Sequence, residues 1–295
     1  MKKIFSIPLV FILLGSFCLK AQHEYYGVTT TGTHTVAPHY WGGRLFKVDS
    51  TGHNLGVLAD LDSSGGAPIG SVIHATNGKL YGTAQYGGVN GEGYLFEYDP
   101  ILDTFQIKID IPYSARYPIM QASNGKIYYA SNHADGYLME YDIITNTLTS
   151  IQYLSYNETP TGTLVEVNGS LYGICSMGGG VGNSGRIYKY NLTTHAFNYV
   201  HNFNCTTEGC GATGGLIKGN NGLLYGALFY QVANPSTNGG SLYSFNPANN
   251  AFVHLINVPD SIGSINFLTL GANNKIYGFG SRGTDVQGSH FGDIF

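Results

Sequence analysis

Residues 77–100 read NGKLYGTAQYGGVNGEGYLFEYDP, and residues 168–191 read NGSLYGICSMGGGVGNSGRIYKYN. Both segments contain Leu-Tyr-Gly and then, after a glycine-rich stretch, Gly-x-Leu/Ile-aromatic-x-aromatic-Asp/Asn. These two anchors recur along the chain with a period of about 50 residues, which indicates a solenoid, a propeller or an array of small domains. The tyrosine anchors are Tyr26, Tyr81, Tyr128, Tyr172, Tyr225 and Tyr277, and the second anchor occupies 43–49, 93–99, 136–142, 185–191, 240–246 and, cut short, 292–295.

Each repeat is predicted to form four short strands. Asn-Gly before the tyrosine anchor predicts a two-residue hairpin in which both residues accept positive φ. Side chains within 95–99 alternate with period two, and we find no helical periodicity after residue 21. Four-stranded antiparallel units of this length predict an all-β fold, a β-propeller of about six blades. The recurring aromatic residues are then expected to pack one blade against the next.

The first and last blades are expected to be incomplete. The chain enters the first repeat at its second strand, residues 25–30, and reaches Phe295 midway through the third strand of the sixth repeat. Propellers commonly complete one blade from both termini, and closing six blades would need roughly 25 further residues. The sequence therefore predicts a chain truncated at its C-terminus, and seven blades stay an alternative.

Residues 1–21 resemble a secretory signal, with Lys2 and Lys3 before an apolar core and a small residue, Ala21, at the end. We expect residues 22–295 to form the repeat domain and the protein to be secreted or at the cell surface. A lipoprotein would use Cys18, but the bulky Phe17 precedes it. No later segment is long and apolar enough to span a membrane.

Without Lys2, Lys3 and Lys20 the chain has 11 basic and 18 acidic residues, and it contains no basic run. This balance disfavours nucleic acid and anionic membranes as partners. We expect a monomer that binds a glycan or a protein.

Three cysteines follow the signal. Cys205 and Cys210 bracket a short loop, and in an oxidising compartment they are expected to form a disulfide, with metal binding as the alternative. Cys175 is expected to be a buried thiol at the end of a strand. No cofactor and no metal are expected.

Motifs for catalysis are lacking, so we expect a protein that is not an enzyme. Asp49, Asp99, Asp142, Asn191 and Asn246 recur at one repeat position, where their short polar side chains are expected to cap a turn.

The loops between the second and third strands are long and unequal, and variable loops on a rigid scaffold often carry function. Trp41 is the single tryptophan and the best aromatic platform for a sugar ring; the alternative for this residue is partial burial. The predicted ligand-binding residues on these loops are His39, Tyr40, Trp41, Tyr86, His133, Tyr230, Asn234, Arg282 and His290.

Residues 77–100 and 168–191 resemble the GloVer-type tandem repeat of exported bacterial proteins, and YDPILDTF (98–105) is similar to kelch repeats. The resemblance covers residues 24–295, with departures at 129–135, 31–43 and 228–240. It implies export and a propeller-like repeat, and it implies no catalytic residues.

The leading hypothesis is an exported, non-enzymatic propeller that binds a glycan or protein at the cell surface. A propeller enzyme, such as a kelch-like copper oxidase or a polysaccharide lyase, is the first alternative. The second alternative is a repeat spacer that presents another domain.

Overall fold

The computed structural model describes residues 24–30, 42–61, 66–68, 70, 72–113, 115–132, 136–155, 158–179, 183–232, 239–259 and 261–280. These residues form strands, turns and loops, and none of them lies in a helix, so no described helix could cross a membrane. The strands are β1 (Glu24–Thr29), β2 (Arg44–Asp49), β3 (Gly56–Asp60), β4 (Ile73–His74), β5 (Leu80–Ala84), β6 (Tyr94–Asp99), β7 (Thr104–Asp110), β8 (Met120–Gln121), β9 (Ile127–Asn132), β10 (Gly136–Asp142), β11 (Thr147–Ser155), β12 (Pro160–Val167), β13 (Ser170–Cys175), β14 (Arg186–Asn191), β15 (Phe197–Asn202), β16 (Cys210–Lys218), β17 (Leu224–Tyr230), β18 (Ser241–Asn246), β19 (Ala251–Asn257), β20 (Ile265–Leu270) and β21 (Ile276–Gly280).

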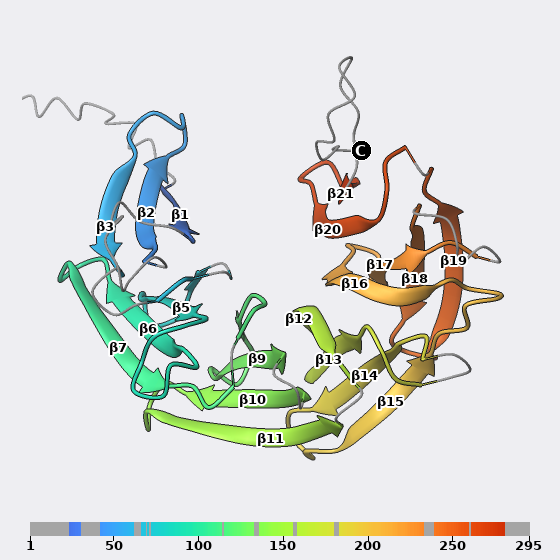
Figure 1. Ribbon diagram of the computed structural model, residues 1–295, viewed down its shortest axis with the longest axis horizontal. Coiled ribbons are helices and arrows are strands. Elements are labelled where there is room, and N and C mark those ends of the chain that lie inside the picture. Colours follow the sequence, from blue (N-terminus) through green and yellow to red (C-terminus); the bar gives the residue numbers. More distant parts are fainter. Residues whose placement is uncertain are drawn as a thin grey trace, which may run out of the picture.

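The strands pair into antiparallel sheets that follow the sequence repeat. The sheets are β1–β3, β4–β7, β8–β11, β12–β15, β16–β19 and β20–β21, and a parallel bridge between Thr163 and Gly215 joins the fourth to the fifth. Figure 1 shows these sheets as blades along an arc around a common centre, with β7, β11, β15 and β19 on the outside. The all-β propeller is therefore confirmed, and the described first and last blades have three and two strands.

The turns before the tyrosine anchors differ from the expected two-residue hairpins. Only the turn at Asn168 (φ 48°) and Gly169 (φ 69°) has that form among the described blades. In the second blade the Gly78 N–H donates to the Ala75 carbonyl, and Gly78 alone in the turn has a positive φ, 81°. This is a three-residue loop, a type I turn followed by a left-handed residue. The third, fifth and sixth blades repeat it, with Gly125, Gly222 and Asn274 as the left-handed residue.

The asparagine of these turns has a side-chain role that explains its recurrence. The Asn77 side-chain oxygen accepts the Lys79 N–H (3.1 Å), and its amide donates to the Tyr81 hydroxyl (2.9 Å). The asparagine therefore links the turn to the tyrosine anchor through its side chain, where we had expected it to supply a positive φ. The same amide-to-tyrosine bond joins Asn124 to Tyr128, Asn221 to Tyr225 and Asn273 to Tyr277.

The turns between the third and fourth strands are capped as predicted. The Asp99 carboxylate accepts the N–H groups of Ile101 (2.9 Å) and Leu102 (3.1 Å). These bonds hold the pKa of Asp99 below its ordinary value, and the Leu102 N–H contributes most. Equivalent bonds are made by Asp49, Asp142, Asn191 and Asn246.

The glycine after the tyrosine anchor makes room for the aromatic residue opposite it. Gly82 pairs with Phe96, and a Cβ on Gly82 would lie 2.3 Å from Phe96 Cζ. The first, fourth and fifth blades repeat the pair as Gly27–Phe46, Gly173–Tyr188 and Gly226–Tyr243. The third blade places Tyr129 opposite Met139, so the bulky ring stands on the other strand. In the third blade the large ring therefore lies on the strand that elsewhere carries the glycine, and the smaller methionine takes the place of the aromatic residue opposite it.

Successive blades share apolar cores. Tyr81 of the second blade is buried with Tyr141 of the third, and their ring centroids lie 6.4 Å apart. Tyr172 and Phe245 meet at the same distance between the fourth and fifth blades. The prediction that the recurring aromatic residues pack blade against blade is thus confirmed, and this packing makes a rigid support for the loops.

Candidate functional site

The loops that follow the second and fourth strands of a blade leave the sheet at the same end, because these two strands run in the same direction. We call this end the loop face. Its described residues are 30, 42–43, 61, 66–68, 70, 72, 85–93, 111–113, 115–119, 158–159, 176–179, 183–185, 203–209, 231–232, 239–240, 258–259 and 261–264. Two hollows lie on it.

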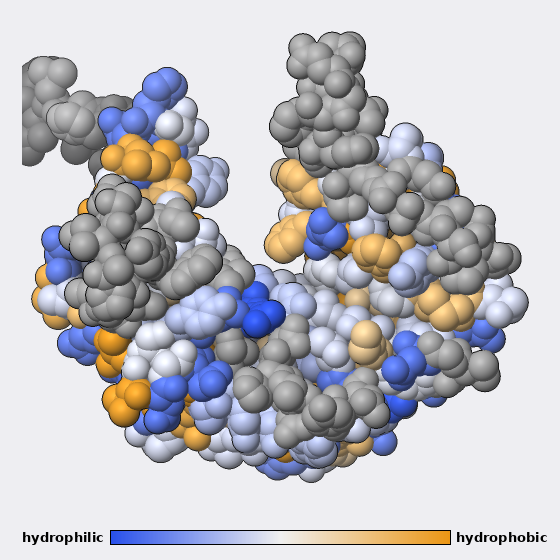
Figure 2. Space-filling view, in the orientation of Figure 1, coloured by the Kyte–Doolittle hydropathy of each residue, from blue (hydrophilic) through white to orange (hydrophobic). Residues whose placement is uncertain are grey.

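The first hollow, the central cavity, has a volume of about 450 Å³ and lies where the blades converge. Figure 2 shows the open space at the centre of the arc, around which the blades are arranged. The lining residues are Gly27, Val28, Thr30, Pro68, Gly70, Arg116, Tyr117, Pro118, Gly162, Thr163, Gly214, Asn266 and Phe267. A volume of this size is typical of small-ligand sites.

The strand register explains which residues line the central cavity. Ile73 pairs with the anchor Tyr81, and Gly70, three positions earlier, lines the cavity. In the other blades, the residue three positions before the strand partner of the tyrosine anchor also lines the cavity. These residues are Tyr117, Gly162, Gly214 and Asn266. Small residues dominate this ring, and the third blade departs from the rule with a tyrosine.

Arg116 precedes that tyrosine and is the charged residue among those lining the central cavity. Its side chain is exposed, whereas Gln85 beside it is only 4% exposed. With the Gln85 amide turned so that its oxygen faces the guanidinium, that oxygen accepts from Arg116 Nε (2.8 Å) and Nη2 (3.2 Å). A guanidinium has five N–H donors in a fixed plane, so Gln85 orients the group and leaves donors for a ligand.

The second hollow, the side pocket, has a volume of about 330 Å³. It is lined by Ser176, Met177, Asn183, Cys210, Gly211, Ala212, Thr213, Phe229 and Tyr230. Met177 is 51% exposed, and the rings of Phe229 and Tyr230 meet edge to face with centroids 4.8 Å apart. The pocket therefore combines aromatic and thioether surface with short polar side chains.

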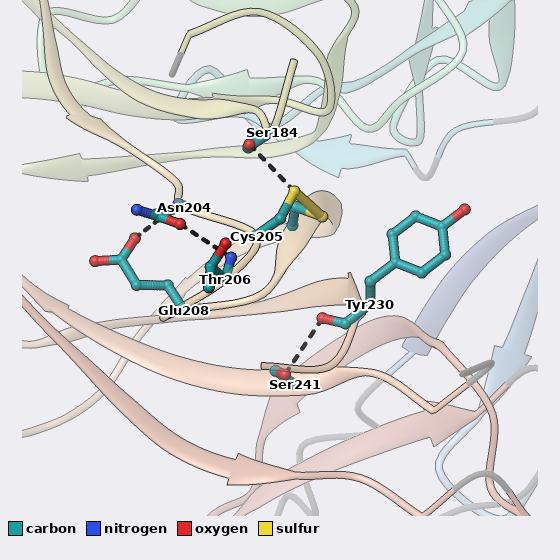
Figure 3. Close-up of a disulfide and its surroundings, with 8 residues drawn as sticks. Ser184, Asn204, Cys205, Thr206, Glu208, Tyr230 and Ser241 are labelled. Atoms are coloured by element: carbon teal, nitrogen blue, oxygen red, sulfur yellow. Dashed lines mark hydrogen bonds between the residues drawn. A yellow bond between two sulfur atoms is a disulfide. The ribbon is translucent and has the colours of Figure 1, made fainter. Parts of the chain in front are cut away.

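Cys205 and Cys210 form a disulfide, and Cys210 lines the side pocket. The Ser184 hydroxyl lies 3.2 Å from Cys205 Sγ, and it is the donor because an oxidised sulfur carries no hydrogen. The Ser241 hydroxyl donates to the Tyr230 carbonyl (3.3 Å), and Figure 3 shows the Tyr230 ring directed away from the disulfide. The backbone at Tyr230 is thus fixed while its ring is left for the pocket.

Polar residues at the ends of the outer strands hold the loop face in place. Asp110, the last residue of β7, accepts the Val89 N–H at 3.1 Å. Asn257, the last residue of β19, accepts the Val232 N–H (3.3 Å), and its side-chain oxygen lies 3.0 Å from the Ser241 hydroxyl, which shares its one proton between this oxygen and the Tyr230 carbonyl. Both residues fix a loop that the sequence predicted as variable, so the loops are anchored at their bases.

A buried ion pair supports the loop face between the third and fourth blades. Glu158 is 6% exposed, and its carboxylate lies 2.6 Å from Arg186 Nη1 and accepts the Tyr199 hydroxyl. The Arg186 guanidinium also lies over the Tyr199 ring, 4.2 Å from its centroid. Cys175 is buried nearby, and burial raises the pKa of its thiol. A protonated thiol is a poor nucleophile, which agrees with the structural role predicted for Cys175.

The opposite end of the blades carries a repeated ionic network. Lys79 Nζ lies 2.8 Å from the Glu97 carboxylate, which also accepts the Tyr81 hydroxyl. The hydrogen bond from Lys79 to Glu97 raises the pKa of the lysine, and burial raises that of Tyr81. The third blade repeats the arrangement with Lys126, Glu140 and Tyr128. Because it recurs at equivalent positions, we assign it to packing.

Of the nine predicted ligand-binding residues, the structure describes two. Tyr230 lines the side pocket, whereas Tyr86, 42% exposed on the loop face, lines neither hollow. His39, Tyr40, Trp41, His133, Asn234, Arg282 and His290 lie outside the described residues. Within the described ranges, no three His, Cys, Asp or Glu residues gather as a metal site.

Sequence reasoning missed the residues that line the central cavity, because it searched the long loops between second and third strands. Arg116 and Tyr117 lie instead just before an inner strand. A signal was available: counting back eleven residues from the tyrosine anchors aligns Tyr117 with Gly70 and Gly214, and Gly162 joins them at ten residues because its blade has the shorter turn. A bulky residue at a position that is otherwise small marks where one repeat differs.

No protein-family model matches the chain, so its resemblance to GloVer-type and kelch repeats stays a prediction. No curated protein matches it either.

Several solved structures are similar in fold. A chain of the nidogen/laminin complex aligns with 12% identity and a TM-score of 0.55, over 88% of this chain and 86% of that one. A putative 6-phosphogluconolactonase from Bacteroides fragilis aligns with 11% identity and a TM-score of 0.59, over 94% and 82%. Oligogalacturonate lyase from Vibrio parahaemolyticus aligns with 10% identity and a TM-score of 0.59, over 86% and 68%. At these identities the likeness bears on the fold alone, and on that evidence this chain has the fold of a β-propeller.

Proposed function

We propose that this chain is an exported, non-enzymatic β-propeller that binds a glycan or protein at the cell surface through its loop face. The observation that supports this best is the side pocket, in which Met177, Phe229 and Tyr230 surround a concave volume of about 330 Å³. Aromatic rings offer flat apolar faces with a polar edge, and thioethers adapt to irregular surfaces. A rigid scaffold that presents such groups is suited to binding.

Binding is favoured over catalysis by the state of the reactive groups that are present. The Cys175 thiol is buried with a raised pKa, and the Glu158 carboxylate is paired with Arg186 and Tyr199. The thiol is shielded and protonated and the carboxylate already has two partners, so we assign a structural role to both. The similar structures include both a protein complex and a lyase, so the fold favours neither class.

Export is supported by the signal-like residues 1–21 and by the disulfide, since disulfides persist in oxidising compartments. Fractionation of the producing cells, with N-terminal sequencing of the recovered protein, tests this part. A mature N-terminus near residue 22 in the exported fraction is expected. A chain that keeps Met1 and stays in the cytoplasm contradicts export.

The binding function is tested by applying the purified chain to arrays of glycans and cell-surface proteins. Tyr230→Ala is compared with Tyr25→Ala, because Tyr25 is 60% exposed and lines neither hollow. We expect Tyr230→Ala to weaken binding about tenfold, the effect of removing one stacked ring worth about 1.4 kcal/mol, and Tyr25→Ala to leave it unchanged.

Equal binding by both variants removes the side pocket from the proposal. Mass spectrometry of the bound glycans provides the second readout, because glycans recovered as cleaved or oxidised products would show an enzyme.

A further inference from the structure

The ring of residues around the central cavity has glycine in the second, fourth and fifth blades, Asn266 in the sixth and a tyrosine in the third. Gly70, Gly162 and Gly214 occupy the position that Tyr117 holds there, and Arg116 precedes that tyrosine. Positions shared by all blades serve packing, whereas a departure at one blade makes the centre of the propeller asymmetric. This departure places a cation and a ring at the cavity wall, where the second, fourth and fifth blades have a glycine at the equivalent position.

The charge of Arg116 is set up to meet an anion. No carboxylate of the described residues pairs with it, and no other lining residue is charged. Its partner Gln85 is buried and neutral, so Gln85 can orient the guanidinium plane without cancelling the charge. A guanidinium in a fixed plane matches the two oxygens of a carboxylate.

The other lining groups fit a sugar better than a peptide. Phe267 is 47% exposed at the cavity, and the exposed Asn266 side chain supplies an amide donor and acceptor. An extended peptide pairs with a free strand edge over several residues, but β12 and β16 bridge each other at Thr163 and Gly215, and the inner strands β4 and β8 are only two residues long. The volume of about 450 Å³ suits one or two rings rather than a length of backbone.

We propose that the central cavity binds a hexuronate unit of an acidic oligosaccharide, with the Arg116 guanidinium holding its carboxylate. The Asn266 amide is then placed for the ring hydroxyls, and the Tyr117 and Phe267 rings for the apolar face of the sugar. This inference rests on the proposed glycan-binding function and names its ligand class. It involves a different hollow from the side pocket, so the two can be tested separately.

The test is isothermal titration of the full chain with trigalacturonate and with galactotriose, its neutral counterpart. We expect trigalacturonate to bind and galactotriose to bind at least about tenfold more weakly, since a charge-assisted hydrogen bond is roughly twice as strong as a neutral one. Arg116→Gln should lower the affinity for trigalacturonate about tenfold or more. Lys275→Gln removes the same charge from an exposed turn at the opposite end of the blades and should leave the affinity unchanged.

Equal affinity of wild type and Arg116→Gln for trigalacturonate would overturn the proposal, as would equal binding of the two sugars. A short poly-glutamate peptide is the third probe; if it binds as tightly as trigalacturonate, the site recognises a carboxylate and not a sugar, which also overturns the proposal. Should trigalacturonate fail to bind while Tyr230→Ala still weakens binding on the glycan array, only this inference fails. If neither site binds any glycan, the proposed glycan binding fails with it.

Discussion

The pairing of Gly82 with Phe96 gives the sharpest stability prediction. An ideal Cβ on Gly82 would lie 2.3 Å from Phe96 Cζ and 2.9 Å from its Cε1. The best carbon–carbon separation is about 3.5–4.0 Å, so Gly82→Ala must displace the Phe96 ring by about 1 Å or more. Phe96 is fully buried against the first blade, so the ring has little room to move.

Overpacking of this kind costs about 1–3 kcal/mol, and we expect Gly82→Ala to lower the free energy of unfolding by that amount. Gly56→Ala is the matched control, because its Cβ would meet only the Lys47 side chain, Cγ at 3.7 Å and Cε at 3.9 Å, and its φ is not in the left-handed region. The control should change stability by no more than about 0.5 kcal/mol. Urea unfolding followed by fluorescence measures both variants.

A second substitution, copied from the third blade, tests whether the steric clash is the cause of the lost stability. There Met139 stands opposite Tyr129, so a methionine at this position accepts bulk from the neighbouring strand. In the second blade Phe96→Met should therefore relieve Gly82→Ala, and the double variant should be about 0.5–3 kcal/mol more stable than the sum of the single effects. Strictly additive effects, or a Gly82→Ala variant as stable as Gly56→Ala, would refute the steric argument.

Three further predictions concern the supports of the loop face and the buried tyrosines. Replacing Cys205 and Cys210 by serine should lower the free energy of unfolding by about 2 kcal/mol, from the entropy of closing so short a loop; an unfolding midpoint that reductant does not shift in the wild type contradicts this. Glu158→Gln should destabilise by about 3–5 kcal/mol, because it leaves the Arg186 guanidinium, 19% exposed, without its anionic partner; a urea midpoint equal to that of wild type argues against it. Burial raises the pKa of Tyr141 to about 12, above the value of about 10 for an unfolded chain. The folded state therefore disfavours its ionisation, so this contribution to stability is complete below pH 10 and is lost as the pH rises toward 12. Urea midpoints measured between pH 8 and 11.5 should fall above about pH 10, and a flat profile would contradict the shift.

Much of the fold could be predicted from the sequence, because the repeat states each packing rule several times. The tyrosine anchors, the capping by Asp99 and its equivalents, and the blade order are confirmed in the structure. The two-residue turn was right at Asn168 and Gly169 and wrong in the other described blades, where Asn77 and its equivalents bond to a tyrosine hydroxyl through the side chain. Dipeptide preference alone does not contain that long-range partner.

The site was harder to predict for a related reason. Tyr230 was among the predicted residues because it ends a strand that leads into a long loop, whereas Arg116 and Tyr117 become neighbours of Gly162 and Asn266 only when the arc forms. Such neighbours are separated by many residues in the chain, and only the strand register brings them to one centre.

The central claim is that shared repeat positions build the scaffold and that the loop face, where repeats differ, binds the ligand. The most direct test compares two double variants on one library of neutral and uronate-containing glycans. Arg116→Gln with Tyr230→Ala alters both hollows, and Tyr25→Ala with Lys275→Gln makes the same chemical changes elsewhere. The account predicts that the first variant loses glycan binding and the second keeps it. Binding kept by the first variant and lost by the second would contradict the account.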